Sequence, residues 1–300
     1  MSLLEVACAV LVPFLWGMQY AIIKEGLAAF PPLFFVGLRF AMVAAILLPL
    51  VGRPTRRELR MFLLISIFIG GLNFGLVFVG LTGAPASVTG IANQLWTPLT
   101  LLLAWPLLGE RPSLLALLGV TMALGGVAVA IGDPASVVPL VPTLYVVGSA
   151  AALAFGTVLS KRYGPFEPMK LMAWISLFTV PQVLGVSALV ETGQVSALSA
   201  ASIPAWLALC YTIFLGGIVG FGLWFWLVSR CSLARVAPYT LLQSPFAIAA
   251  GALFKHEPLT PAVVAGALIC ISGVAITQRQ SSGQPSDNPR GSLTPARRRL

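Results

Sequence analysis

The chain has 300 residues, of which 58% are hydrophobic and only 9% are Asp, Glu, Lys or Arg. Soluble domains carry about 25% charged residues, so this chain has too little charge to cover a water-facing surface of its size. A soluble enzyme is therefore excluded, and the composition indicates an integral membrane protein. The net charge of +9 predicts no nucleic-acid partner, because only the C-terminal tail is locally basic.

Charged residues divide the chain into uncharged intervals about as long as a membrane-spanning helix, which needs about 20 mostly apolar residues. Interval 61 to 109 is long enough for two helices and is interrupted at Gly80, Gly83 and Pro85. Interval 192 to 229 predicts one helix, because its serine-rich first part predicts a loop. A further helix, over about 32 to 51, contains a single interior charge, Arg39. We therefore predict ten spans, the others lying in 6 to 23, 112 to 132, 134 to 160, 171 to 190, 236 to 254 and 258 to 278.

The basic residues predict the orientation of these spans. With the N-terminus inside, only Lys24 and Lys255 fall in outer loops. Because Lys and Arg accumulate on the cytoplasmic side of membrane proteins, both termini are expected in the cytoplasm, beside anionic lipid. The cytoplasmic basic residues would be Arg53, Arg56, Arg57, Arg60, Arg111, Lys161, Arg162, Lys170, Arg230, Arg235 and the arginines of the tail.

An internal repeat relates the two halves of the sequence. A shift of 147 residues places Pro98 on Pro245 and Glu110 on Glu257. The same shift superposes Gly70 on Gly217, Phe74 on Phe221, Gly75 on Gly222, Gly119 on Gly266, and Gly126-Val127-Ala128 on Gly273-Val274-Ala275. Each half contains five predicted spans, an odd number, so the second half must enter the membrane from the opposite side. We therefore predict an all-α integral membrane protein with ten transmembrane helices in two inverted five-helix repeats.

Inverted repeats are typical of transporters, in which two similar halves rock about a site near the membrane midplane. A membrane scaffold or a membrane enzyme is the alternative. The enzyme reading is weak, because Asp133 and Asp287 are the only aspartates and His256 is the only histidine. These residues leave no aspartyl dyad, no Ser–His dyad and no zinc motif within the spans, and no Walker A sequence is present. We predict no catalytic residue, no metal and no cofactor.

Neutral polar and aromatic side chains are the candidates for a substrate site. A buried amide needs a partner, so each either bonds a neighbouring helix or lines a water-filled cavity, and the sequence favours neither. No carboxylate lies clearly at mid-depth, which argues against proton antiport. The candidates for binding substrate are Trp16, Gln19, Tyr20, Asn73, Phe78, Asn93, Gln94, Trp96, Trp224, Tyr239 and Gln243.

Three further residues within the spans can be interpreted as either structural or functional. Pro98 and Pro245 lie inside helices at equivalent positions of the repeat, and proline frees backbone carbonyls there. They predict kinks that act as hinges beside the substrate, or kinks that only improve packing. Arg39 is a possible structural or substrate-binding charge, with the structural role favoured. Small residues at Gly71/Gly75 and Gly216/Gly220 predict close helix packing.

The sequence resembles the ten-helix exporters with two EamA domains in the drug/metabolite transporter superfamily. The residues that carry the resemblance are Trp16-Gly17 followed by Lys24, Gly37-Leu38-Arg39-Phe40, the segment from Ala84 to Pro98, Gly109-Glu110-Arg111, and Glu257-Pro258. The order, spacing and duplication of these short motifs are specific, although each alone is degenerate. Within the superfamily, the chain is most similar to the YddG-like amino-acid exporters of bacterial inner membranes.

This resemblance implies a first EamA-type repeat over residues 1–133, a second over 139–278, and a cytoplasmic tail over 279–300 that its composition predicts to be disordered. It implies export of neutral and aromatic amino acids from the cytoplasm, by a monomer in the bilayer. A nucleobase, a sugar or a cationic drug stays open as the small-molecule substrate.

Overall fold

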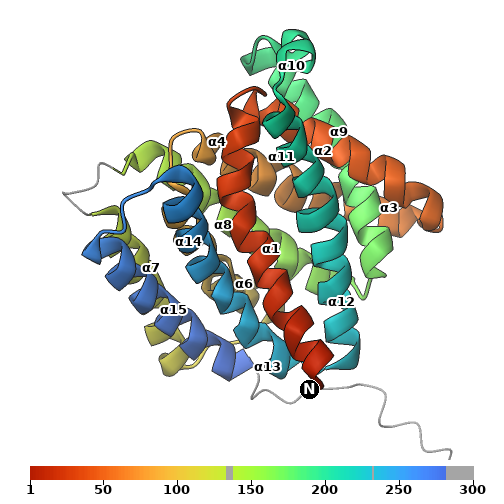
Figure 1. Ribbon diagram of the computed structural model, residues 1–300. Coiled ribbons are helices and arrows are strands. Elements are labelled where there is room, and N and C mark those ends of the chain that lie inside the picture. The colour runs from red at the N-terminus through yellow and green to blue at the C-terminus, as the bar shows by residue number, and fades with distance from the viewer. Residues whose placement is uncertain (133–137, 232, 282–300) are drawn as a thin grey trace, which may run out of the picture.

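The computed structural model describes residues 1–132, 138–231 and 233–281, and these residues form helices and no strand. Figure 1 shows the helices packed as one bundle, with α10 at the end opposite the N-terminus. The elements are α1 (Leu3–Leu27), α2 (Pro32–Leu47), η1 (Leu48–Leu50), α3 (Arg56–Ser66), η2 (Ile67–Phe74), α4 (Gly75–Leu81), α5 (Ala86–Asn93), α6 (Trp96–Leu108), α7 (Leu114–Ile131), α8 (Leu140–Tyr163), α9 (Pro168–Val190), α10 (Gln194–Ala200), α11 (Ile203–Ile213), η3 (Phe214–Val219), α12 (Gly220–Arg230), α13 (Leu233–Val236), η4 (Ala237–Leu242), α14 (Gln243–Lys255) and α15 (Pro261–Ser281).

Eight of the described helical segments are long and apolar enough to cross a membrane. They are Leu3–Leu27, Pro32–Leu50, Arg56–Leu81, Leu114–Ile131, Leu140–Tyr163, Pro168–Val190, Ile203–Arg230 and Pro261–Gln278. The remaining two predicted spans are interrupted helices. One consists of α5 and α6, and the other of α13, η4 and α14.

Two details differ from the sequence-based expectations. The serine-rich segment predicted as a loop contains α10, which follows Gly193 in the left-handed conformation (φ 81°) and carries hydroxyls that bond backbone carbonyls three residues earlier. Helix α15 runs to Ser281, so the predicted tail begins with three helical residues, because nothing breaks the helix after Gln278. The rest of the predicted disordered tail, residues 282–300, lies outside the described residues.

Two π-helical segments, η2 and η3, lie at equivalent positions of the sequence repeat, since Ile67 and Phe214 are 147 residues apart. Both are rich in glycine, and side chains of neighbouring helices fill the space that a Cβ would occupy. The hydroxyl of Thr179 lies against Gly70, and the amide oxygen of Gln19 lies against Gly216. Since π-bulges occur frequently at functional sites, these segments are candidates for positions where the spans change shape.

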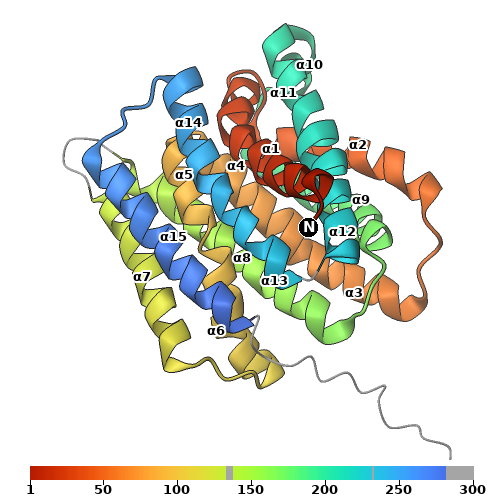
Figure 2. The same cartoon turned by 60° about the horizontal axis from the view of Figure 1, so that its bottom comes forward.

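The helix pairs of the bundle are related in the same way as the sequence repeat. Helix α1 packs against α14, and α8 packs against α6; α7 packs against α15, and α2 against α9. Figure 2 shows α7 and α15 side by side along one flank. Their contact is antiparallel, because a Cβ on Gly119 would meet the Gly273 carbonyl at 2.7 Å and a Cβ on Gly126 would meet the Gly266 carbonyl at 2.6 Å. The 147-residue shift converts one of these glycine pairs into the other.

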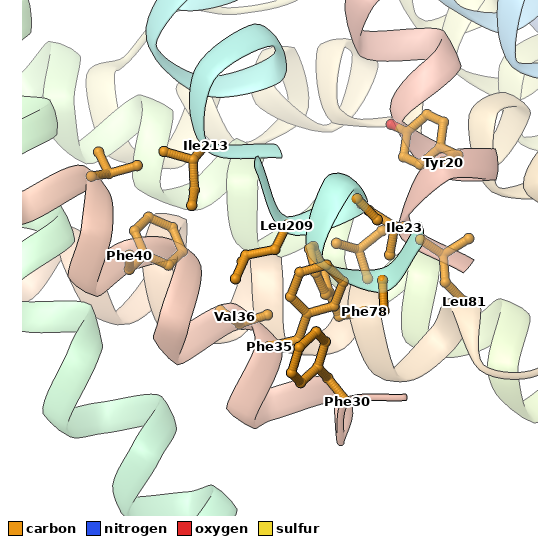
Figure 3. Close-up of a cluster of buried hydrophobic side chains, with 14 of the residues drawn as sticks. Tyr20, Ile23, Phe30, Phe35, Val36, Phe40, Phe78, Leu81, Leu209 and Ile213 are labelled. Atoms are coloured by element: carbon orange, nitrogen blue, oxygen red, sulfur yellow. The ribbon is translucent and has the colours of Figure 1, made fainter. Parts of the chain in front are cut away.

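The largest apolar core lies between α1, α2, α4 and α11 (Figure 3). Phe35 and Phe78 are fully buried, and their rings meet edge to face with centroids 5.2 Å apart. Close packing around aromatic rings of this size makes a rigid wall. This core holds α1 and α2 beside the segments that form the candidate site.

Candidate functional site

A cavity of about 300 Å³ lies between α6, α8, α12, η4 and α15. Its walls combine aromatic rings with hydroxyl and amide groups. The lining residues are Trp96, Thr97, Thr100, Leu101, Ala104, Leu108, Glu110, Thr157, Val158, Lys161, Trp224, Ala237, Thr240 and Gln278. A mostly apolar cleft with a few polar groups is the usual form of a small-molecule site.

Helical spacing explains why these residues share one wall. Thr97, Thr100, Ala104 and Leu108 follow one another at intervals of three or four residues in α6, so they lie on one face of the helix. The Thr100 hydroxyl donates to the Trp96 carbonyl at 2.6 Å, whereas the buried Thr97 hydroxyl has no hydrogen-bond partner. The Thr97 hydroxyl therefore has unused hydrogen-bonding capacity at this wall.

One end of the cavity reaches the surface beside an ion pair. Lys161 Nζ lies 2.6 Å from Glu110 Oε1, and these side chains are 63% and 34% exposed. Arg162 donates a hydrogen bond to the Leu107 carbonyl at the same end. This exposed pair holds α6 to α8 only weakly, because solvent screens it.

Glu257, at the other end of the α5–α6 segment, accepts hydrogen bonds at the N-terminus of α5. Its oxygens accept from the backbone N–H groups of Ala86 at 2.6 Å and Ser87 at 2.9 Å, and from the Ser87 hydroxyl at 2.7 Å. Lys24 Nζ lies 3.6 Å from Glu257 Oε1 and donates to the Ala84 carbonyl at 2.8 Å. We call this arrangement the Glu257 cap. It joins α1, α5 and the start of the α14–α15 connection, and charge-assisted bonds at a helix N-terminus are among the stronger ones.

Polar side chains between the two ends join the interrupted helices. Gln94 Nε2 donates to the carbonyls of Thr240 and Leu241 at 3.1 and 3.3 Å, and the Ser244 hydroxyl donates to the Gly90 carbonyl at 2.9 Å. Gln243 Nε2 donates to the Tyr20 hydroxyl at 2.8 Å. Backbone groups released where α5 ends and where η4 leads into α14 are thus satisfied by side chains of the other repeat.

The structure places Pro98 and Pro245 in the first turns of α6 and α14, which begin at Trp96 and Gln243. A proline there removes no helical hydrogen bond, because the first N–H groups of a helix have no partner within it. The interruption in the first half falls at Gln94 and Leu95, before the proline. The prolines therefore start the second helical segments and do not kink continuous helices.

Trp16 and Gln19 approach η3 from α1. The Trp16 indole N–H donates to the Gly216 carbonyl at 3.0 Å, and its ring lies 6.0 Å from that of Trp224 between centroids. Trp224 lines the cavity, so Trp16 forms the next layer behind that wall. Gln19 is 8% exposed, and its Oε1 atom has no hydrogen-bond partner.

Nine of the eleven predicted substrate-binding residues are absent from the cavity lining, and three of these make contacts elsewhere. Asn73 donates to the Ile69 carbonyl within its own segment at 3.3 Å, Phe78 belongs to the apolar core of Figure 3, and Tyr239 packs against a cluster around Leu227 and Val236. Asn93 is a hydrogen-bonding neighbour of the Tyr20 hydroxyl. Of the predicted substrate-binding residues, Trp96 and Trp224 line the cavity directly.

Arg39 is 3% exposed and lies over the Phe74 ring, with its guanidinium carbon 4.2 Å from the ring centroid. Within the part of the chain that the structure describes, its Nε and Nη1 atoms have no hydrogen-bond partner. A Cβ on Gly217 would lie 3.9 Å from Arg39 Nη2, so the guanidinium faces η3 from α2.

Sequence reasoning missed the threonines of the wall and the Glu110–Lys161 pair at the mouth. The signal was present, because Thr97, Thr100 and Ala104 repeat at helical spacing after the interrupted segment. Glu110 is also the repeat equivalent of Glu257. Whether these side chains face the cavity or the lipid could not be deduced without the neighbouring helices.

A bundle of apolar helices around a cavity with tryptophan and hydroxyl walls is typical of a membrane transporter. Residues 3–132 and 141–279 both match the EamA-like transporter family. The chain belongs to that family, and its predicted membership of the drug/metabolite transporter superfamily is confirmed.

Two relatives and one solved structure show how far the similarity extends. The chain is 29% identical over 285 residues to a probable amino-acid metabolite efflux pump of Escherichia coli (strain K12), with 92% of this chain and 95% of that protein covered. It is 30% identical over 277 residues to a protein of the same name from Salmonella typhimurium, with 89% and 92% covered. A protein of known crystal structure shares the fold, with a TM-score of 0.62, 18% identity and coverage of 92% of this chain and 98% of the other.

Proposed function

We propose that this transporter exports small metabolites, above all neutral and aromatic amino acids, from the cytoplasm of a bacterium across its inner membrane. The observation that carries the proposal is the cavity that opens beside Glu110 and Lys161, while Glu257, at the other end of the α5–α6 segment, is hydrogen-bonded to the start of α5. With the Glu257 cap as the closure beyond the cavity, this arrangement corresponds to one of the two states that alternating access requires.

The proposed architecture is ten spans in two inverted repeats, with both termini in the cytoplasm. The two π-helical segments and the two interrupted helices lie 147 residues apart, and they support the repeat. Antiparallel packing of α7 on α15 through exchanged glycine pairs supports its inversion. In this orientation the structure is open to the cytoplasm.

The repeat suggests how the second state forms. Glu110 and Glu257 are equivalent, yet Glu257 is bound at the start of α5 whereas Glu110 is held only by Lys161 at an exposed site. In the outward-open state, Glu110 would take the corresponding position at the start of α13, and Glu257 would leave α5. One closure would thus replace the other as the two halves rock.

The cavity chemistry supports a small amphipathic substrate. The Trp96 and Trp224 rings can bury many side chains and attract an ammonium group, while threonine hydroxyls supply hydrogen bonds. Each contact of this kind contributes about 0.5–2 kcal/mol, so we expect dissociation constants nearer millimolar than micromolar. Weak binding suits an exporter that acts when its substrate accumulates, and the names of the two relatives support amino acids.

Counterflow of labelled amino acids into reconstituted vesicles tests this function. We expect exchange of phenylalanine or a neutral amino acid well above that of empty-lipid vesicles. Replacing Ala104 by Phe should lower exchange at least tenfold, because Ala104 lines the cavity and a ring there would fill much of it. Val129→Phe, at an exposed position of α7, is the matched control and should transport normally.

No exchange across a broad amino-acid panel would contradict the amino-acid proposal. Nucleobases, sugars and cationic drugs would then be assayed with the same vesicles. If the protein moves none of these solutes, the scaffold interpretation replaces transport.

Reporter fusions test the topology. Fusions at Arg57, in the first turn of α3, should report the cytoplasm, and fusions at Ser199, in α10, should report the outside. Four spans separate the α2–α3 connection from α9, and α9 itself is a fifth crossing, so α10 lies on the opposite side. The measurement compares alkaline phosphatase and fluorescent-protein activity at each point. Equal activity patterns at Arg57 and Ser199 would contradict the inverted arrangement.

A further inference from the structure

Two buried polar groups of opposite hydrogen-bonding character face the same glycine pair in η3. Arg39, from α2, has unpartnered donors at Nε and Nη1, and Gln19, from α1, has an unpartnered acceptor at Oε1. Arg39 Nη2 lies 3.9 Å from the position of a Cβ on Gly217, and Gln19 Oε1 occupies the position of a Cβ on Gly216. The donor and the acceptor therefore both lie against one short stretch of backbone.

No described carboxylate neutralises Arg39. The four ion pairs of the described chain are Lys24–Glu257, Lys161–Glu110, Lys170–Glu58 and Lys255–Glu25. Glu191 is bound to the N–H groups of Leu33 and Phe34, and Glu5 caps α1. The Phe74 ring offsets part of the cost of burying the guanidinium, but an unpaired charge in the membrane interior is strongly unfavourable and marks a functional site by default.

We propose that Arg39 and Gln19 bind the two charged ends of a zwitterionic substrate. The Arg39 guanidinium binds the carboxylate, for which its planar fork is suited, and Gln19 Oε1 accepts a hydrogen bond from the ammonium group. Gly216 and Gly217, which the two groups face, present no side chains there. This inference rests on the proposed function and narrows it to solutes that carry both a carboxylate and an amino group.

Aromatic side chains connect the cavity wall to this pair. Trp224 lines the cavity, the Trp16 ring packs on Trp224, and the Trp16 indole is bonded to the Gly216 carbonyl. A substrate that enters from the Glu110 end therefore meets Trp224 and Trp16 before η3. Movement of Trp16 away from Gly216 would uncover Gln19 and Arg39, and the substrate would satisfy groups that have no partner without it.

Analogue binding to the purified full-length protein tests the assignment. L-phenylalanine would be compared with L-phenylalaninamide, which lacks the carboxylate, and with 3-phenylpropionate, which lacks the ammonium group. We expect the wild-type protein to bind phenylalanine at least tenfold more tightly than either analogue. Arg39→Gln should weaken phenylalanine binding at least tenfold while changing amide binding less than twofold. Gln19→Leu should weaken phenylalanine and its amide, but leave 3-phenylpropionate within twofold.

Arg230→Gln is the matched control, because Arg230 also lies over an aromatic ring, 4.9 Å from the Trp226 centroid, but at an exposed helix end. It should leave all three affinities unchanged. Arg39→Lys keeps the charge without the planar fork. It should lower the preference for phenylalanine over phenylalaninamide at least threefold. This second variant decides the matter if Arg39→Gln does not yield folded protein.

The preference for acid over amide separates the two proposals. The Arg39 assignment is overturned if the Arg39 variants keep the wild-type preference for phenylalanine over phenylalaninamide, or if the wild-type protein binds the two equally. Amino-acid export can still stand in either case. If the wild-type protein moves no amino acid in the vesicle assay, the proposed function fails instead. A purely structural role for Arg39 would lower stability and leave the affinity ratio unchanged.

Discussion

Replacing Gly126 by alanine is expected to destabilise the packing of α7 on α15 by about 1–3 kcal/mol, the usual cost of inserting a methyl group into a packed interface. The added Cβ would meet the Gly266 carbonyl at 2.6 Å and the backbone of Cys270. These are backbone atoms, which cannot rotate away, so the helices would have to separate. Helix propensity alone would favour alanine by roughly 0.5–1 kcal/mol. We therefore expect a net loss that thermal unfolding in detergent measures as a lower Tm.

Gly125 provides the control for this substitution. It is the neighbouring residue in the same helix, and a Cβ there would meet no atom within 4 Å. Gly125→Ala should therefore leave the Tm unchanged or raise it slightly. Equal effects of the two substitutions would show that α7 and α15 do not approach each other through this face.

Replacing Glu257 by glutamine is expected to weaken the proposed closure at the start of α5. The carboxylate accepts from two backbone N–H groups and a hydroxyl and lies beside Lys24. A glutamine side chain presents only one acceptor oxygen. Its NH2 group would face backbone N–H groups at the start of α5, and both are hydrogen-bond donors. Hydrogen bonds to charged groups contribute about 1.5–3 kcal/mol each, so loss of the closed state by roughly 3 kcal/mol would shift the equilibrium about a hundredfold.

Cysteine labelling measures this opening. In a protein without its four native cysteines, Leu81→Cys reports on the Glu257 end, because Leu81 is 1% exposed and lies beside the cap. Adding Glu257→Gln should raise its rate of reaction with a membrane-impermeant maleimide at least tenfold and slow transport. Glu110→Gln, at the repeat-equivalent exposed pair, should change the same rate little, because an exposed pair contributes about 0–1 kcal/mol. Unchanged labelling in the Glu257 variant would contradict the cap as a closure.

Much of the fold could be predicted because membrane insertion is a local property of sequence. Each apolar interval bounded by charges corresponds to a helix or an interrupted helix in the structure, and the composition identified the class of protein. The interrupted segments were harder, since an apolar run of suitable length looks the same whether its helix is continuous or broken at Gln94 and Leu95. Prolines marked these regions. Where each helix breaks relative to its proline depends on which backbone carbonyls find hydrogen-bond partners.

The substrate site was less predictable for a physical reason that applies to spanning helices in general. Lipid and protein core are both apolar, so helical periodicity does not show which face of a span points inward. Gln94 and Tyr20 could be selected as polar, yet only packing shows that Gln94 bonds the Thr240 and Leu241 carbonyls while Trp96, two residues later, lines the cavity. Phe78 was chosen by the same reasoning and lies in the core.

The sequence by itself determined that this chain is a helical membrane protein with a duplicated set of apolar segments, because burial in lipid depends on composition over about 20 residues and not on distant contacts. Only the tertiary structure decided where a cavity lies, and which of two equivalent glutamates is hydrogen-bonded to a helix N-terminus. It also decided that Arg39 Nε and Nη1 find no hydrogen-bond partner among the described residues. These features depend on where side chains from helices far apart in sequence meet, and the energy of such contacts belongs to the pair and not to either residue alone.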